Sequence, residues 1–208
     1  MSVKQSGGIA RVRAQARACR ACPLWQGATQ TVFGEGPDRA SIMLVGEQPG
    51  DSEDREGQPF VGPAGRVLDR ALTAARIERA ELYTTNAVKH FKYSQRGKRR
   101  IHQRPSVAET SACRPWLQAE IELIRPRVIV ALGATAAHAL IGRATPIAAN
   151  RGQPLQGALF SPVLVAAHPS SILRKREHDA RDAALQALGE DLRLAAEIAA
   201  DGGAARAS

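Results

Sequence analysis

The segment Ser41–Asp51, with the sequence SIMLVGEQPGD, joins an apolar run to a loop that carries two carboxylates and an amide. Ser41–Val45 is typical of a buried strand, and the glycines and the proline after it force a turn. Ligands of open α/β sheets bind beyond the carboxyl ends of the strands. Glu47, Gln48 and Asp51 therefore make a candidate active site, with Glu47 as a possible general base. An ordinary polar loop between a strand and a helix has a similar composition.

Two further apolar runs end on polar residues that could bind or transform a ligand. Residues 82–88 (LYTTNAV) contain Asn86, and His168-Pro-Ser-Ser follows residues 163–166. An asparagine offers a donor and acceptors that suit the edge of a planar amide or a nucleobase, and Phe60 in the loop after the first strand could stack on such a ring. Singly, each is more often a turn or core residue. Together, at one edge of a parallel sheet, they indicate a site.

Residues 89–105 (KHFKYSQRGKRRIHQRP) hold seven Lys or Arg residues and no acid, with Phe91 and Tyr93 between them. A basic loop with aromatic residues suits the phosphates and stacked bases of a single or opened strand; the alternative is a solvated loop. His102 lies among these cations, which favour its neutral form. A neutral imidazole can act as a nucleophile or a base, and a phosphate contact is an equal possibility for it.

The chain has three cysteines, Cys19, Cys22 and Cys113. An odd number, without a secretory signal in the sequence, argues against a framework of disulfides. The C-x-x-C spacing of the first two indicates a metal, a cluster or a redox pair.

Composition favours a globular protein that meets a polyanion. Of 208 residues 44% are hydrophobic and 24% charged, and the net charge is +9 with a pI of about 10.3. Nucleic acid is the first partner to expect of so basic a domain, ahead of an anionic membrane. No run approaches the ~20 apolar residues of a membrane span, and the N-terminus has no apolar signal core, so we expect a cytoplasmic protein.

The periodicity predicts four strands that alternate with helices. The strands are residues 41–45, 82–88, 127–132 and 163–166, and the helices are residues 66–76, 106–123, 134–141 and 178–200. This order predicts an α/β fold, a three-layer α/β/α sandwich with a central four-stranded parallel sheet. We expect one domain over residues 1–208, with an N-terminal arm (1–17) and a frayed tail (201–208). Ser106 fits a capping box, and Pro115 should kink or restart its helix.

Seven motifs in chain order resemble the uracil-DNA glycosylase superfamily: GEQPGD, EGQPFVGPAG, TTNAVKHFK, KRRIH, ACRPW, IRPRVIVALGATAA and HPSSILR. The resemblance covers about residues 18–194 and is strongest to the covalent type-X branch. Ordinary iron–sulfur members lack the KRRIH insertion, and Gln48 and His90 also fit the type-X pattern. The resemblance thus implies a uracil-DNA glycosylase-like fold.

The resemblance implies excision of uracil that has been flipped out of the DNA stack. Phe60 would stack on uracil, Asn86 would read its amide edge, and His168 would stabilise charge on its O2. Glu47 would stabilise the sugar cation, and His102 would then attack C1′ and leave the DNA bonded to the protein. The implied uracil contacts also include Gly46, Gln48 and Asp51, and the implied DNA contacts are Lys98, Arg99, Arg100, Arg104 and Ser170.

Two alternatives stay open at this point. One is a conventional iron–sulfur glycosylase in which water attacks C1′ and His102 only contacts phosphate. The other is a non-catalytic binder of damaged single strands. The expected partner is uracil-containing DNA, including single-stranded DNA, bound by a monomer.

The resemblance also gives the cysteines a role. Family members with an iron–sulfur cluster use four cysteines, and here His90 stands at the position of the fourth. The resemblance therefore implies a [4Fe–4S] cluster held by Cys19, Cys22, His90 and Cys113. Mixed Cys/His ligation is known in Rieske centres. Zinc in a Cys₃His site would use the same four residues.

Overall fold

The central sheet has the spatial order β2-β1-β5-β7-β6 in the computed structural model, which describes residues 8–157 and 159–204. Its strands are β1 (Ile42–Gly46), β2 (Tyr83–Asn86), β5 (Val128–Leu132), β6 (Leu155–Gln156) and β7 (Pro162–Ala166). The first, second, fifth and seventh strands are parallel, as predicted, and the two-residue β6 adds an antiparallel edge. The sequence did not predict β6, because two residues are too few for a periodic pattern.

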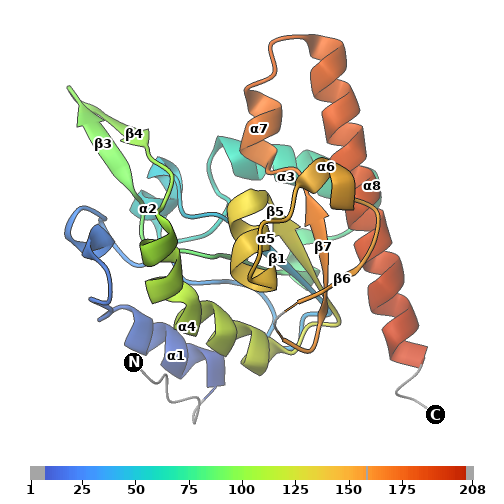
Figure 1. Cartoon of the computed structure of the whole chain (residues 1–208), viewed down its shortest axis with the longest axis horizontal. Helices are drawn as coiled ribbons and strands as arrows, with labels where there is room; N and C mark the ends of the chain where they lie inside the picture. The colour runs from blue at the N-terminus through green and yellow to red at the C-terminus, as the bar shows by residue number, and fades with distance from the viewer. Residues whose placement is uncertain (1–7, 158, 205–208) are drawn as a thin grey trace.

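Helices cover both faces of the sheet (Figure 1) and make it the middle layer of a three-layer sandwich. On one face lie α1 (Gly8–Ala16), α4 (Val107–Ile124) and α5 (Ala134–Ile141); on the other lie α3 (Pro63–Ala75), α7 (Pro169–Leu173) and α8 (His178–Ala204). The parallel strands bury both faces, which explains why they read as continuous apolar runs.

The main departure from the predicted elements is the basic segment, which forms an antiparallel hairpin rather than a loop. Its strands are β3 (Tyr93–Arg96) and β4 (Arg99–His102), with Gly97 at a positive φ of 59° in the turn. Its residues are mostly exposed, so they show no alternation of apolar and polar side chains. The hairpin and α7 both project beyond the edge of the sheet where β7 ends (Figure 1).

Several boundaries also differ from the prediction. Helix α4 begins after the Ser106 capping box, as expected, but continues through Pro115 instead of restarting there. The expected arm contains α1, and residues 1–7 lie outside the described part. Helix α8 extends to Ala204, so residues 201–204 are helical rather than frayed, and residues 205–208 are not described. The short helices α2 (Asp51–Glu56) and α6 (Ile147–Asn150) and two 3₁₀ turns (Pro23–Gln26, Arg79–Glu81) complete the chain.

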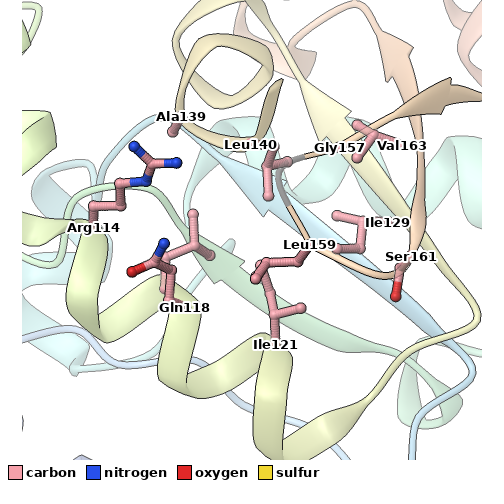
Figure 2. Close-up of a pocket in the computed structure, with 11 residues that line it drawn as sticks. Arg114, Gln118, Ile121, Ile129, Ala139, Leu140, Gly157, Leu159, Ser161 and Val163 are labelled. Atoms are coloured by element: carbon pink, nitrogen blue, oxygen red, sulfur yellow. The ribbon is translucent and has the colours of Figure 1, made fainter. Parts of the chain in front are cut away.

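A small apolar cavity of about 10 Å³ lies between α4, α5 and the sheet (Figure 2), lined by residues such as Leu117, Ile129 and Leu140. It has room for about one water molecule and few polar groups to bind one, so it is not a ligand site. Among the described residues no helix has the length and apolarity needed to span a bilayer.

Candidate active site

A cleft of about 970 Å³ opens at the carboxyl ends of the parallel strands. This is where an open α/β sheet binds its ligands. Nine of the residues singled out in the sequence line it, although they come from five separate segments: Glu47, Gln48, Asp51, Phe60, Asn86, His102, Arg104, His168 and Ser170. Gly46, Lys98, Arg99 and Arg100 are not among the lining residues.

Asn86, Phe60 and Gly46 pack together at the floor of the cleft. Asn86 ends β2 beside Gly46, which ends β1, and both Asn86 and Phe60 are almost fully buried. A Cβ atom on Gly46 would lie 2.3 Å from Asn86 Oδ1 and 2.7 Å from Phe60 Cζ. Gly46 therefore does not line the cleft; its missing side chain makes room for the two residues that do.

Phe60 adopts a left-handed backbone conformation, with φ of 57°. This conformation is uncommon for a bulky residue and needs support from its surroundings. Arg79 Nη2 donates to the carbonyl oxygens of Pro59 (3.0 Å) and Phe60 (2.9 Å), while Arg79 Nη1 contacts Asp69 at 2.6 Å. The Phe60 ring centre lies 6.3 Å from that of His168, which also lines the cleft.

His168 is held as a neutral imidazole with a defined tautomer. Burial and the nearby charges of His102 and Arg174 lower the pKa of His168 to about 4. The backbone N–H of Ser170 donates to His168 Nδ1 at 3.1 Å, so the hydrogen of the neutral ring is on Nε2. Nε2 is thus a hydrogen-bond donor available to a ligand. Ser170 is used to orient this ring, with its Oγ 2.8 Å from the same Nδ1.

Glu47 and His102 meet across the cleft, although 55 positions separate them in the chain. Glu47 Oε1 lies 3.4 Å from His102 Nε2, and half of the His102 side chain is exposed. The other carboxylate oxygen, Oε2, accepts a hydrogen bond from Thr135 Oγ1, and Arg104 Nε lies 3.9 Å from it. Arg104 Nε also donates to Thr135 Oγ1 at 3.2 Å. Thr135 therefore fixes one oxygen of Glu47 and leaves the other directed at His102.

The side chain of Gln48 joins the hairpin to the loop after β1. Its Nε2 donates to the carbonyl oxygens of Lys92 (3.2 Å) and Gln103 (2.9 Å), and its Oε1 accepts the N–H of Lys92 at 3.1 Å. These bonds occupy both the nitrogen and the oxygen of the Gln48 side-chain amide, and they connect it to the two chain segments at the base of the hairpin. Gln48 lines the cleft, but its hydrogen bonds hold the segment that carries His102 rather than a ligand.

Arg100 is placed differently from the DNA contact that the sequence suggested. Its Nε lies 2.5 Å from Asp51 Oδ1 and its Nη1 lies 2.6 Å from Asp54 Oδ2, and only 11% of its side chain is exposed. Asp51 forms salt bridges with both Arg100 and Arg55. Burial alone would raise the pKa of Asp51, but these two salt bridges lower it below its usual value. The pair Arg100–Asp51 thus fastens β4 to α2, while Asp51 also lines the cleft.

Two other cations of the basic segment are also paired inside the protein. Lys89 is buried against Glu120, and Lys92 Nζ lies 2.8 Å from Glu109. Lys98, Arg99 and Arg104 are exposed, and they stay candidates for phosphate contacts.

The chain is similar to known proteins over most of its length. A model of the uracil DNA glycosylase superfamily matches residues 33–193. The chain belongs to the uracil-DNA glycosylase superfamily. It is 39% identical to a type-4 uracil-DNA glycosylase of Thermotoga maritima over 84% of this chain and 88% of the relative. A type-4 enzyme of Pyrobaculum aerophilum is 36% identical (76% and 80% covered), and a type-5 enzyme of that organism is 29% identical (66% and 64%).

These relatives confirm the superfamily predicted from the motifs. They are of types 4 and 5, and the assignment to the covalent type-X branch stays a prediction.

In this superfamily member, Gly46→Ala should damage the site without removing any polar group. The new methyl group must displace Asn86 or Phe60, because it would lie within 3 Å of both. We expect uracil release to slow by about 100-fold, since a displacement of about 1 Å is enough for such a loss. Single-turnover release of uracil measures the effect, with Gly189→Ala in α8 as a control, where a Cβ would have no neighbour closer than 3.7 Å.

His168 gives a prediction for pH. Its folded-state pKa of about 4 lies below the usual 6.5, so the unfolded chain binds the proton first as the pH falls. The free energy of unfolding should therefore decrease between pH 6.5 and 4, by on the order of 3 kcal/mol from this group. NMR titration of the His168 ring should give a midpoint near 4, and His168→Gln should lose less stability over that range. A midpoint near 6.5 would contradict the assignment of a neutral ring.

The three thiols lie in one region next to His90. Burial raises the pKa of Cys113 to about 12; the charge and the N–H of Lys89 oppose this rise, and the thiols of Cys22 and Cys19 add to it. Trp116 Nε1 donates to Cys19 Sγ at 3.1 Å, and the Lys89 N–H donates to Cys113 Sγ at 3.2 Å. Such N–H donors stabilise thiolate ligands. Binding of a metal centre must therefore release protons from these thiols.

His90 is suited to be a ligand in its neutral form. Burial and the charge of Arg20 lower its pKa. Thr31 Oγ1 donates to the carbonyl of Ala16 and lies 3.0 Å from His90 Nε2. Because a hydroxyl has one hydrogen, Nε2 must be the donor in that contact, which leaves the lone pair on Nδ1.

In the described part of the chain, the possible metal ligands of this region are not grouped around a single point. Among the described residues, no three His, Cys, Asp or Glu side chains are grouped so that they could hold one ion. A four-iron cluster binds each ligand at a separate iron atom, so its ligands need not converge on one point. The donor set consists of two buried thiols, one half-buried thiol and a buried imidazole, which are ligand types that such a cluster can use.

Several further residues line the cleft and were not predicted from the sequence, among them Thr135, Leu173 and Arg174. Thr135 lies in the first turn of α5 and reads in the sequence as an ordinary early helix residue. Leu173 and Arg174 end α7, and Leu173 is one of the few large apolar side chains that are exposed. The HPSSILR motif contains both, and their place after His168 in that motif is the signal that could have indicated them.

Proposed function

We propose that this protein excises uracil from DNA and becomes covalently attached to the resulting abasic site through His102. The observation that carries the proposal is the contact of His102 Nε2 with Glu47 Oε1, 3.4 Å apart, in the cleft that Asn86 and His168 also line. A binding module without chemistry would not need a carboxylate oriented on a half-exposed histidine.

The floor of the cleft would recognise the flipped base. Phe60 offers a buried ring beside Asn86, and the amide of Asn86 can both donate to and accept from the edge of uracil. The Nε2–H of His168 would donate to the uracil O2 as negative charge develops there. Its neutral state matters, because a neutral donor stabilises the leaving anion without first having to lose a proton.

The first chemical step would break the bond between C1′ and N1 of uracil. The electron pair of that bond leaves with the uracil anion, and positive charge develops on the sugar. Glu47 is the nearest carboxylate to His102 and would stabilise this charge. Thr135 and Arg104 keep one of its oxygens in place, so the carboxylate need not reorganise during the step.

In the second step one ring nitrogen of His102 would donate its lone pair to C1′ and form the N–C1′ bond. The ring is then a cation, and an imidazolium is a fair leaving group. Glu47 would accept the proton from the other ring nitrogen, which leaves a neutral imidazole that departs poorly. The adduct would persist, and each protein molecule would act once.

We propose in addition that the thiol region binds a [4Fe–4S] cluster through Cys19, Cys22, His90 and Cys113. When bound, it would crosslink the segment after α1, the start of the hairpin and α4. That segment reaches the hairpin directly, since Tyr93 Oη donates to the carbonyl of Gly27 at 3.0 Å. The role that we assign to the cluster is structural.

DNA would be held by the exposed cations of the hairpin, Lys98, Arg99 and Arg104, with the +9 net charge supporting association. We propose a monomer that accepts uracil in single-stranded DNA, because an unstacked base costs less to bring into the cleft.

A denaturing gel tests the proposal. Wild-type protein mixed with uracil-containing single-stranded DNA should give a slow-migrating species that survives boiling in detergent, and His102→Ala should not. If no such band forms while abasic DNA accumulates beyond one equivalent, the protein is a conventional turnover enzyme. Tight, salt-dependent binding without any release of uracil would instead indicate a binder of damaged strands.

A further inference from the structure

Lys89 and Glu120 form an ion pair that is buried outside the cleft. Lys89 Nζ lies 2.5 Å from Glu120 Oε2, and the side chains are 1% and 0% exposed. A buried ion pair is weak evidence for stability, because the loss of hydration offsets much of the attraction. Its position in the fold indicates another use.

The three hydrogens of the Lys89 ammonium have three acceptors. They are Glu120 Oε2, Thr85 Oγ1 at 2.7 Å and the backbone carbonyl oxygen of Asn86 at 2.7 Å. A lysine has no further donor. The ammonium group is therefore fixed in place, and one of its bonds anchors the residue proposed to read uracil.

Glu120 is fixed just as firmly from α4. Its Oε1 accepts from the Gly34 N–H (2.8 Å) and the Tyr83 hydroxyl (3.1 Å), and both of its oxygens lie 3.0 Å from Thr85 Oγ1. The pair thus ties the end of β2 to α4.

The main chain of Lys89 is held as well. Its N–H donates to the thiol of Cys113, which lies two turns before Glu120 on α4. Lys89 is therefore fixed at both ends, with its ammonium group under Asn86.

We infer that Lys89, held by Glu120, is a positioning residue that sets the place of Asn86 for uracil recognition. The inference rests on the proposed function. Lys89 does not line the cleft, so it acts through the Asn86 carbonyl and touches neither uracil nor DNA. Loss of this contact should slow uracil release and leave the affinity for DNA unchanged, since the exposed cations that would bind phosphate are elsewhere.

The test replaces both charges together, in the variant Lys89→Met/Glu120→Leu. An apolar pair of similar size in place of a buried ion pair is often neutral for stability or increases it, so a purely structural role predicts no loss of activity. We expect a folded protein whose single-turnover uracil release is about 10- to 100-fold slower, with an unchanged Kd for uracil-free DNA. Tyr83→Phe, which removes one bond to Glu120 but none to Asn86, is the matched control and should keep the wild-type rate.

A folded double variant with the wild-type rate of uracil release would overturn the inference. If the double variant does not fold, Lys89→Gln/Glu120→Gln decides, because it keeps neutral hydrogen-bonding groups in the buried region but leaves no ammonium group to bond the Asn86 carbonyl oxygen. Slower release at an unchanged Tm would support the inference, and an unchanged rate would overturn it. Absence of uracil release by the wild type is a separate result, which contradicts the proposed function itself.

Discussion

The His102→Ser variant is expected to release uracil and free abasic DNA over many cycles, and to give no crosslinked species. The hydroxyl is a weaker nucleophile than an imidazole, and the shorter side chain leaves room for water beside Glu47, where half of the His102 side chain is already exposed. Released uracil should exceed one equivalent of protein, whereas the wild type should stop at one. Time courses of uracil release with DNA in excess measure the difference.

His178→Ser is the matched control for that experiment. His178 begins α8, its side chain is 82% exposed, and it pairs with Asp182, far along the chain from the proposed catalytic residues. This variant should crosslink like the wild type. If His102→Ser is folded but inert towards uracil, then His102 takes part in breaking the glycosidic bond, and the separation of the two steps is wrong.

The Glu47→Gln variant should lose both steps. The amide keeps the size of the side chain but carries no charge to stabilise the sugar and cannot accept the proton from His102. We expect uracil release to slow by about 10²- to 10³-fold, as when a single electrostatic or acid–base group is removed. Single-turnover quench assays measure uracil release, and denaturing gels measure the adduct.

Glu56→Gln makes the same change of charge on an exposed residue of α2 that does not line the cleft. It should behave as the wild type. A Glu47→Gln protein that releases uracil at the wild-type rate and still forms the crosslink would show that neither step uses this carboxylate.

The parallel sheet and its site loop were predictable because their signals are local. Ser41–Val45 is one apolar run that ends at a glycine, and the strand containing Asn86 is another; both strands were found within two residues of their predicted bounds. Once the strands are parallel, their carboxyl ends lie at one edge, so Glu47, Asn86 and His168 had to lie near each other.

The features that were not predicted depend on pairs of residues that are distant in the chain. Lys89 and Arg100 read as two cations among seven, yet one is buried against Glu120 and the other against Asp54. The acids that neutralise them lie 31 and 46 positions away. No local pattern distinguishes a cation that pairs inside the protein from one that meets phosphate.

Gln48 shows the same limit for an uncharged residue. Its place in the loop after β1 predicted a pocket residue, which is where it lies. That its amide is occupied by two backbone segments of the hairpin follows from the hairpin itself, which the exposed, non-periodic residues 93–102 did not reveal.

Mass spectrometry of the wild-type reaction tests the central claim most directly. After incubation with a uracil-containing oligonucleotide, the intact mass should equal protein plus oligonucleotide minus one uracil. Fragmentation of the digested product should place the sugar on His102. Unmodified protein beside abasic DNA, or a sugar attached to any other residue, would contradict the covalent role of His102.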